Sequence, residues 1–406
     1  MTNASTTIAE LSAESNMKRQ GVFTYPEIDR VVFGKPFVEA LKAEADRLGV
    51  SRIFILASGT LVRKTDCLSR LEAEMGGRIA GVYDRLRPHV QREDVLEATT
   101  AARELGADLV LTIGGGTPTD AAKMVCLCLA NDVEDYEGID RLRATSGPDG
   151  AVVQPDVVTP TVRSIFVPTT LSAGEFAAGA GCTDSRRHIK QMFRHPLLAP
   201  QVVILDPQIT THTPEWLWLS TGVRAVDHTV EDLCSIHLQP YVEGTARHAL
   251  RLLARGLSRC KEDPGDLSAR LDCQVGAWMS MIGGAAGVTK GASHGIGHML
   301  GGIAGVPHGY TSCVMLPSVL SWNSSVNADR QAIISETLDR PSKAASGVIG
   351  DLIASLGMPT RLRDVDVRHD QFQEIAEASM HDRWITTNPR KIDGPDQIVE
   401  ILEMAW

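Results

Sequence analysis

The fold is decided by the stretch Gly114-Gly115-Gly116-Thr117-Pro118-Thr119-Asp120-Ala121-Ala122-Lys123, which follows a strand-like run and opens an apolar helical pattern. Three glycines let backbone N–H groups approach a phosphate closely, and a helix N-terminus favours a bound anion. We expect Thr117 to be the helix N-cap and Pro118 to fill the first helical position. The stretch therefore predicts a phosphate cradle, with an ordinary strand-to-helix turn as the alternative.

Strand and helix patterns alternate on both sides of this stretch. Strand-like runs cover residues 52–57, 108–113, 164–167 and 202–205, and residues 93–105 show helical spacing that ends before Gly106. Residues 144–161 are rich in Pro, Gly, Asp and Thr, which is typical of a surface loop. Buried strands separated by helices predict a parallel sheet with both faces covered.

The pattern changes after Pro207, where helical spacing replaces strand-like runs. Helices are expected over residues 222–236, 243–260, 270–286 and 342–356, with Pro341 separating the last from a shorter helix over 331–338. A chain of 406 residues exceeds a typical single domain. We therefore predict an α/β N-terminal domain with a parallel sheet over residues 1–200, and an all-α C-terminal domain over residues 201–406.

Charge and composition exclude several classes of protein. The net charge of −10 argues against nucleic-acid binding, and no apolar run is long enough to span a membrane. Residues 1–21 lack the apolar core of a secretory signal, so we expect a flexible start or a swapped arm. The eight cysteines show no metal-type spacing, and Cys126 and Cys128 are expected to pack in a helix. These features favour a reduced, cytoplasmic setting.

Taken together, the motifs resemble those of the iron-containing alcohol dehydrogenase superfamily over nearly the whole chain. Gly114, Gly115, Gly116, Thr117, Asp120 and Lys123 match its pyrophosphate loop, and Pro168-Thr169-Thr170 matches its cofactor-contacting segment. Later matches, in chain order, are Asp206-Pro207, Thr213-Pro214, Thr221-Gly222, His228, Glu231, His294-Gly295, His298, Pro307-His308-Gly309 and Asn388-Pro389-Arg390. The resemblance implies a dinucleotide-binding N-terminal domain, NADH or NADPH as cofactor, binding by the glycines, Thr117, Asp120, Thr169 and Thr170, and a homodimer.

One residue departs from the family's metal site. Metal-dependent members carry an Asp one helical turn before the first His ligand, and two later histidines complete the set; here Arg224 stands at the Asp position before His228. Arginine has no lone pair for a metal. Two interpretations follow. In the first, Zn or Fe is still coordinated by His228, His294 and His308. In the second, the metal is absent and Arg224 binds a substrate carboxylate instead. We expect the second.

The carboxylates nearest to this position are Asp227 and Glu231. Asp227 is adjacent to His228 on the helix, so its side chain points about 100° away and is not expected to replace the missing ligand. Asp227 and Glu231 are themselves four residues apart. We interpret them as a pair that supports the site from outside, or as a solvated pair.

A second departure from the family's pattern indicates which branch of the family the chain resembles. The segment Pro168–Glu175 is one residue shorter than the usual family segment, which resembles the maleylacetate reductases of aromatic-ring breakdown. The resemblance implies reduction of an unsaturated keto acid that carries a carboxylate. We predict as catalytic residues Arg224, His228, His294, His298 and His308, with His294 or His298 supplying the proton. The sequence around Ala57-Ser58-Gly59 does not decide between NADH and NADPH.

Three other functions stay open at this point. The first is a zinc- or iron-dependent alcohol dehydrogenase that acts on small alcohols and aldehydes. The second is a different reaction on the same fold, as in the related dehydroquinate synthase and glycerol phosphate dehydrogenase families. The third is an inactive relative that binds a ligand or a partner. His212, His237 and His248 are interpreted as structural in every case.

Overall fold

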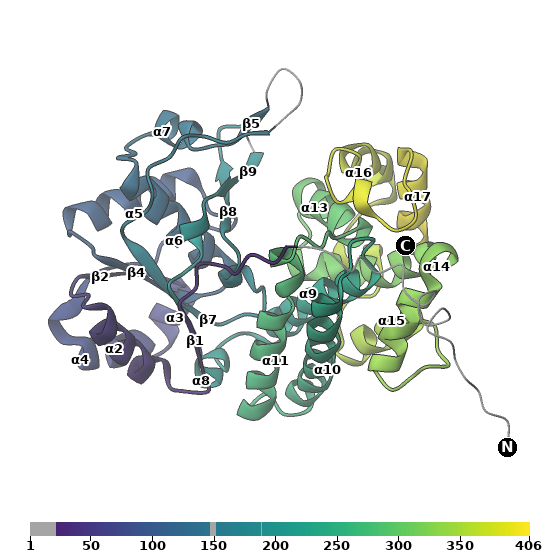
Figure 1. Cartoon of the computed structure of the whole chain (residues 1–406), viewed down its shortest axis with the longest axis horizontal. Helices are drawn as coiled ribbons and strands as arrows, with labels where there is room; N and C mark the ends of the chain where they lie inside the picture. Colours follow the sequence, from purple (N-terminus) through teal and green to yellow (C-terminus); the bar gives the residue numbers. More distant parts are fainter. Residues whose placement is uncertain (1–21, 147–151, 188) are drawn as a thin grey trace.

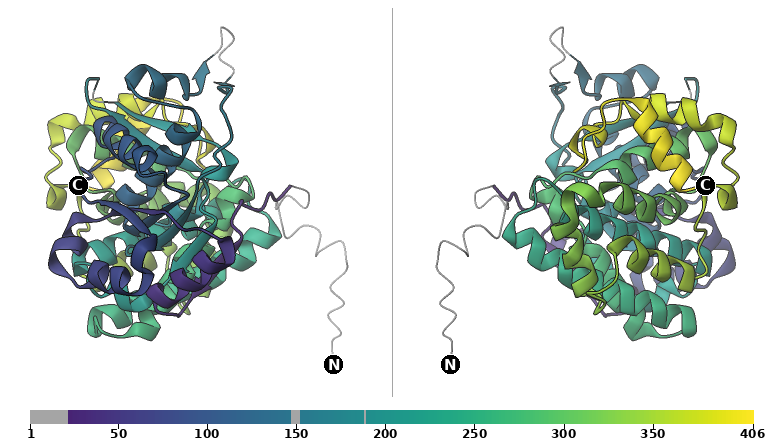
Figure 2. Two further views of the ribbon diagram at one scale, coloured as in Figure 1. Left: turned by 90° about the vertical axis from the view of Figure 1, so that its left-hand side faces the viewer. Right: turned by 90° about the vertical axis from the view of Figure 1, so that its right-hand side faces the viewer.

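The computed structural model describes residues 22–146, 152–187 and 189–406, and it consists of two domains side by side (Figure 1). The domain with the sheet is purple to teal, and the helical domain is green to yellow. The two turned views show each domain from its own side (Figure 2). The predicted fold class, α/β followed by all-α, is confirmed. The boundary near residue 200 stays a prediction; the last strand of the sheet ends at Leu205. The arm expected over residues 1–21 lies outside the described residues.

A six-stranded parallel sheet forms the centre of the first domain, in the order β1-β10-β7-β4-β2-β3. Alternate residues face opposite sides, so that Ile53 and Ile55 join one core while Phe54 and Leu56 join the other. The strands are β1 (Arg30–Phe33), β2 (Ile53–Ala57), β3 (Ile79–Tyr83), β4 (Leu109–Gly114), β7 (Arg163–Pro168) and β10 (Val202–Leu205). Two antiparallel pairs stand apart: β5 (Thr145–Ser146) with β6 (Val152–Val153), and β8 (Gly179–Asp184) with β9 (Ile189–Arg194).

Helices cover both faces of this sheet, as the buried strands require. One face carries α2 (Phe37–Leu48), α3 (Gly59–Lys64), α4 (Cys67–Met75) and α8 (Pro207–Thr210). The other carries α5 (Arg92–Glu104), α6 (Gly116–Ala130) and α7 (Tyr136–Arg141). Short 3₁₀ turns are η1 (Gly76–Arg78), η2 (Gly174–Phe176) and η3 (Pro196–Leu198). Cys126 and Cys128 are buried on α6, as expected, and all eight cysteines are free and buried.

The second domain is arranged around one central helix, α9 (Glu215–Cys234), which is buried at every position from Trp218 to Cys234. Its neighbours are α10 (Pro240–Glu262), α11 (Leu267–Met279), α12 (Ile282–Ala285), α13 (Ala292–Ala304), α14 (His308–Thr337) and α15 (Ala345–Ser355). The C-terminal part adds η4 (Leu362–Val365), η5 (His369–Gln371), α16 (Phe372–Ser379), η6 (Ile385–Thr387) and α17 (Pro395–Met404). A helix buried on all sides can only present its polar side chains to other protein groups.

Several sequence-based expectations for local structure are wrong. The helix expected over 270–286 divides into α11 and α12 at Ser280 and Met281, before the helix-weakening pair Gly283 and Gly284. The helix expected over 331–338 is the end of α14, which bends at Asn327 (φ −137°) instead of stopping. Part of the expected loop over 144–161 is the β5–β6 pair.

The beginning of α6 also differs from the prediction. The N-cap is Gly115 rather than Thr117, and the helix begins at Gly116, so Pro118 is the third helical residue. The extended backbone of Gly115 (φ −92°, ψ −154°) lets the chain turn into the helix two residues before the expected cap. The glycines are therefore part of the helix terminus itself.

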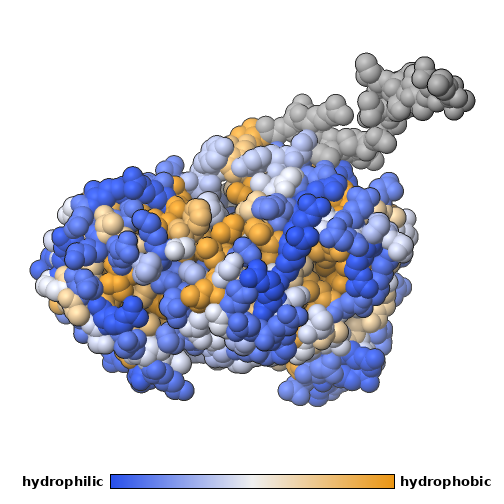
Figure 3. Space-filling view, turned by 90° about the horizontal axis from the view of Figure 1, so that it is seen from below, coloured by the Kyte–Doolittle hydropathy of each residue, from blue (hydrophilic) through white to orange (hydrophobic). Residues whose placement is uncertain are grey.

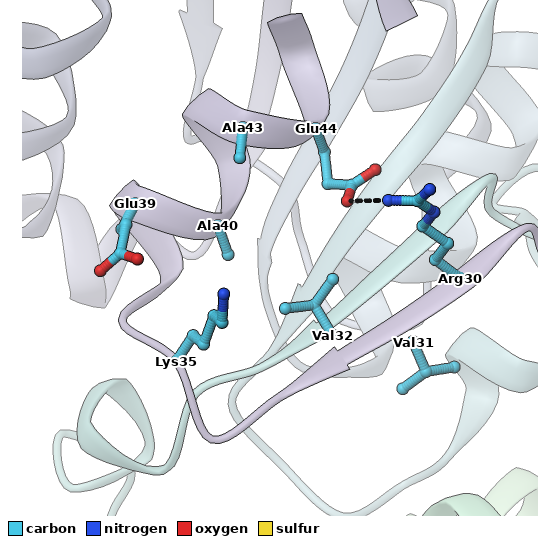
Figure 4. Close-up of a pocket in the computed structure, with 8 residues that line it drawn as sticks. All are labelled: Arg30, Val31, Val32, Lys35, Glu39, Ala40, Ala43 and Glu44. Atoms are coloured by element: carbon cyan, nitrogen blue, oxygen red, sulfur yellow. Dashed lines mark hydrogen bonds and ion pairs between the residues drawn. The ribbon is translucent and has the colours of Figure 1, made fainter. Parts of the chain in front are cut away.

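The surface away from the junction of the two domains has few features that bear on function. Among the described residues, no helix is long and apolar enough to cross a membrane. Seen from below, hydrophobic residues appear in patches between hydrophilic ones (Figure 3). A cavity of about 340 Å³ lies between edge strand β1 and α2, where Arg30 pairs with Glu44 at 3.3 Å and Lys35 lies opposite Val32 (Figure 4). None of the predicted site residues lines it.

Candidate active site

The glycine turn lies at the carboxyl end of β4, the central strand that leads into α6. A Cβ added to Gly115 would approach Thr170 Cγ2 to 2.9 Å, and one added to Gly114 would approach Pro118 Cγ to 2.8 Å. A Cβ on Gly116 would meet only Ser172 Oγ, at 3.6 Å. No side chain caps this end of α6. The turn therefore fits a phosphate group, because backbone N–H groups at the helix terminus can point at an anion.

Two charged residues of the same motif lie beneath the turn. Lys123 is fully buried on α6, and its Nζ donates to the carbonyl oxygens of Gly174 (2.7 Å) and Gly179 (2.9 Å). Asp120 Oδ2 accepts the N–H of Gly181 at 3.1 Å. Both side chains thus tie α6 to η2 and β8. The role of Asp120 in cofactor binding stays a prediction, and its observed contact is with this backbone.

The segment after β7 connects the glycine turn to the helical domain. The N–H of Thr169 donates to Gly114 O at 2.9 Å, and Thr213 Oγ1 donates to Thr169 O at 2.7 Å. One residue beyond Thr170, the N–H of Leu171 donates to Thr221 Oγ1 at 3.1 Å. Thr221 lies on α9 about one turn before Arg224. The turn predicted to bind phosphate and the helix that carries Arg224 are therefore joined by direct contacts.

Arg224 lies inside the helical domain and is only 3% exposed. Its Nη1 donates to Ser312 Oγ at 3.0 Å and lies 3.5 Å from Asp227 Oδ2. The Ser312 hydroxyl donates in turn to Asp227 Oδ2 at 2.6 Å. Burial raises the pKa of Asp227, and the Arg224 charge opposes that rise. The guanidinium stays charged, because arginine does not deprotonate in proteins.

Glu231 places His294 by capping the helix that carries it. The Glu231 side-chain oxygens accept the N–H groups of Gly291 (3.0 Å) and Ser293 (2.9 Å), which are free at the start of α13. Asn388 Oδ1 accepts the N–H of Ala292 at 3.1 Å, in the same turn of the helix. Burial and the neighbouring Asp227 raise the pKa of Glu231 to about 8. The interpretation of Asp227 and Glu231 as a solvated pair is wrong, because they are 0% and 6% exposed.

His294 and His228 are buried neighbours with ring centroids 5.0 Å apart. His294 Nδ1 lies 2.7 Å from Glu231 Oε2, but this contact lacks the direction of a hydrogen bond, so both ring nitrogens of His294 have no hydrogen-bond partner. Burial holds the pKa of both imidazoles well below the ordinary value, with the charges of Lys290 and Arg224 adding to the effect. Both rings are therefore neutral at physiological pH.

His298 and His308 form a second pair nearer to solvent. Their rings are parallel, with centroids 6.1 Å apart. His298 Nδ1 lies 2.7 Å from Asp382 Oδ2. His308 begins α14 and is exposed, and the Arg224 charge holds its pKa well below the ordinary value. Gly309 allows this position, because a Cβ there would come within 2.7 Å of the Ser220 backbone on α9.

The residues present do not fit a divalent metal at the family's position. In the part of the chain that the structure describes, the only three metal-binding side chains with donor atoms within 4.8 Å of one another are Asp227, Glu231 and His294. The expected set of His228, His294 and His308 is not brought together in this way. Asp227 Oδ2 already accepts two hydroxyl groups and faces Arg224, and both Glu231 oxygens accept backbone N–H groups. A divalent cation would therefore meet the Arg224 guanidinium, and of the four carboxylate oxygens only Asp227 Oδ1 accepts no hydrogen bond.

Four buried polar atoms in this cluster have no hydrogen-bond partner: Arg224 Nε, Asp227 Oδ1 and both ring nitrogens of His294. Buried polar groups are nearly always satisfied in folded proteins. This concentration of unpartnered polar atoms makes the cluster a candidate binding site.

The chain joins a parallel sheet with an open glycine turn to a helical domain with a buried histidine and arginine cluster, and its similarity to proteins named dehydrogenase and maleylacetate reductase identifies it as an oxidoreductase. Residues 29–207 match the family model "Iron-containing alcohol dehydrogenase", and residues 218–406 match "Fe-containing alcohol dehydrogenase family, C-terminal". The chain belongs to the iron-containing alcohol dehydrogenase family, and the expected resemblance to its maleylacetate reductase branch is confirmed.

Individual relatives cover almost the whole chain. Dehydrogenase FUM7 of Gibberella moniliformis is 35% identical over 92% of this chain and 95% of its own length. Maleylacetate reductase of Pseudomonas aeruginosa is 28% identical over 93% of this chain and 95% of its own. The crystal structure of maleylacetate reductase from Agrobacterium tumefaciens superposes with a TM-score of 0.79 at 25% identity, covering 96% of this chain and 98% of the other.

Sequence reasoning missed the polar residues that come from outside the motifs. Ser312, Lys290 and Asp382 all contact the predicted site residues, yet none has a spacing that signals this. Ser293 was open to prediction, because it directly precedes His294. Asp382 follows α16 and reaches His298 across 84 residues of sequence, which only the tertiary fold reveals.

Proposed function

We propose that this chain is an NADH- or NADPH-dependent reductase of an unsaturated keto acid that carries a carboxylate, of the kind on which maleylacetate reductases are named to act. The observation that carries the proposal is the buried Arg224 guanidinium, which lies among the histidines with its Nε unpartnered. A guanidinium can hold a carboxylate through two parallel hydrogen bonds. The similarity to maleylacetate reductases over more than nine-tenths of the chain supports the same substrate class.

The cofactor site in this proposal is the glycine turn. The turn from Gly114 to Thr117 would hold the pyrophosphate, and Thr169 and Thr170, which directly follow β7, would hold the nicotinamide half. The fit rests on the open backbone at Gly116 and on the uncapped helix N-terminus. When bound, the dihydronicotinamide supplies a hydride, that is, one hydrogen with two electrons.

The protein groups act on the charge that this hydride creates. The substrate gains a C–H bond at its electron-poor carbon, and the electron pair of its double bond moves toward the ketone oxygen as an enolate. Arg224 and the neighbouring imidazoles stabilise that negative charge. A proton from His294 or His298 completes the second C–H bond. The product has one carbon–carbon double bond fewer than the substrate.

Metal independence is part of the proposal. The charge that a metal supplies in other family members is here supplied by Arg224, whose counter-ion is Asp227 at 3.5 Å. The competing function is a metal-dependent alcohol dehydrogenase. Its support is the proximity of Asp227, Glu231 and His294.

The deciding experiment compares substrates with and without the carboxylate in wild type and Arg224→Ala. NADH and NADPH oxidation is followed with maleylacetate, with its carboxylate methyl esters and with simple aldehydes, each with and without a chelator. We expect the acid to be preferred, no effect of the chelator, and loss of the acid-over-ester preference in Arg224→Ala by on the order of 100-fold. The ratio of two substrates corrects for any loss of folded protein. An unchanged ratio contradicts the role of Arg224, and aldehyde activity lost to the chelator favours the alcohol dehydrogenase.

The assembly is a separate part of the proposal. The family resemblance implies a homodimer, and light scattering on the purified chain tests it.

A further inference from the structure

His298 differs from His294 in two properties that a proton donor needs: access to water and a hydrogen-bond partner. Its side chain is 36% exposed, so that it can exchange protons with water, whereas the side chain of His294 is 5% exposed. Its Nδ1 has a carboxylate partner, Asp382 Oδ2, at 2.7 Å. The two nitrogens of His294 have no hydrogen-bond partner, and that ring lies in the positive field of Arg224.

The carboxylate of Asp382 is itself held in place. Its Oδ1 accepts the N–H of Trp384 at 2.9 Å, which leaves Oδ2 facing His298. A carboxylate can only accept, so Nδ1 of His298 must donate and therefore carries a hydrogen. Nε2 is then the nitrogen that gains and loses the transferable proton.

From this arrangement we infer that His298 is the proton donor of the reaction and that Asp382 is the positioning residue that fixes its tautomer and ring orientation. The inference rests on the proposed function and deepens it, because it chooses between His294 and His298. No covalent bond to the protein forms: the proton on Nε2 passes to the α-carbon of the enolate, the C=O bond of the ketone forms again, and water returns a proton to Nε2.

Other titratable and charged groups surround His298 and its partner Asp382. The ring of His308 on α14 lies parallel to the ring of His298. A Cβ added to Gly297, the residue before His298, would lie 3.8 Å from Arg224 Nη1. Farther out, Lys190 of β9 acts on His308, and Arg383 lies next to Asp382. Of these groups, Asp382 is the one in hydrogen-bond contact with His298.

The first test is Asp382→Asn, which keeps an oxygen for the Trp384 N–H but removes the charge. We expect kcat to fall on the order of 100-fold with little change in KM. The double variant His298→Gln/Asp382→Asn should be no slower than His298→Gln alone, because the two residues act as one unit. Glu403→Gln is the matched control: it removes the carboxylate from the exposed His369–Glu403 pair of 2.6 Å and should change nothing.

A second test needs no substrate and no cofactor. Nitrogen-15 NMR of histidine-labelled wild type, with His298 identified by comparison with His298→Gln, should show a hydrogen on Nδ1 and titration at Nε2. In Asp382→Asn the form with hydrogen on Nε2 should increase. A wild-type His298 that carries its hydrogen on Nε2, or an unchanged rate in Asp382→Asn, overturns the inference. A correct tautomer in a protein inactive on every carboxylate substrate overturns the proposed function and leaves the pairing of the two residues intact.

Discussion

Arg224 Nη1 and Asp227 Oδ2 lie 3.5 Å apart on helix α9, and Ser312 from α14 bridges them by accepting from one and donating to the other. Both charged side chains are almost completely buried. An ion pair in such a place stabilises the protein only while both members are present, since either one alone is an uncompensated buried charge. The Arg224–Asp227 pair therefore restricts which charged groups can bind at the centre of the site.

Removal of one member should destabilise the fold more than removal of both. We expect Arg224→Ala to lower the free energy of unfolding by about 3–5 kcal/mol, because it leaves Asp227 unpaired. The double variant Arg224→Ala/Asp227→Asn should recover a large part of that loss. Urea unfolding followed by circular dichroism measures both. A double variant that loses the sum of the two single effects would show that the residues do not interact.

Restoring a carboxylate one turn before His228 should give the site metal affinity. Arg224→Asp removes the guanidinium, places a donor on the same helix face as His228, and frees Asp227. We expect this variant to bind Co²⁺ stoichiometrically, with visible absorption from the bound ion, whereas wild type and Arg224→Leu show none. Stoichiometric binding by wild type would contradict the interpretation that Arg224 excludes a cation.

The raised pKa of Glu231 predicts how stability depends on pH. Its folded pKa of about 8 lies above the ordinary value of 4.5, so between these values the folded protein holds a proton that the unfolded chain releases. This group therefore makes the folded state less stable as pH rises from about 4.5 to 8. We expect the unfolding free energy of wild type, relative to Glu231→Gln, to fall between pH 5 and pH 8. A difference that is constant with pH would place the proton elsewhere.

The glycine turn should not tolerate a side chain at Gly115. An added Cβ would approach Thr170 Cγ2 to 2.9 Å and Oγ1 to 3.1 Å, so Gly115→Ala should displace Thr170 and the turn. We expect NADH binding, followed by the fluorescence of the bound nicotinamide, to weaken at least tenfold. Gly77→Ala is the control, because nothing lies within 4 Å of a Cβ there. Equal affinity in the two variants would remove the turn from the cofactor site.

The sheet could be predicted only where its strands are buried. The runs at β2, β4, β7 and β10 are rich in Val, Ile and Leu because helices cover both faces. The two strands that were missed, β1 and β3, are the two edges of the sheet, where burial is partial and the hydrophobic signal weakens. The pair β8 and β9 was also missed, since its glycines and polar residues do not alternate in a regular way.

In the site, too, the residues related by local spacing could be predicted, and those brought together by the tertiary fold could not. Arg224 and His228 share one helix, so their spacing predicts a common face. Asp382 and Ser312 reach their partners from other elements, and sequence spacing carries no record of that approach. The start of α6 was misjudged because Thr117 has the chemistry of a cap, while the backbone freedom of Gly115 begins the helix earlier.

Lys123 lies under the glycine turn and donates to the carbonyl oxygens of both Gly174 and Gly179. With Asp120 bound to Gly181, the first turns of α6 are attached to β8 before any ligand arrives. A turn already held in its binding geometry loses little conformational entropy when it takes up a phosphate. In a motif where every charged residue could be assigned to the ligand, these two instead keep the empty turn in shape, so that more of the binding energy remains as affinity.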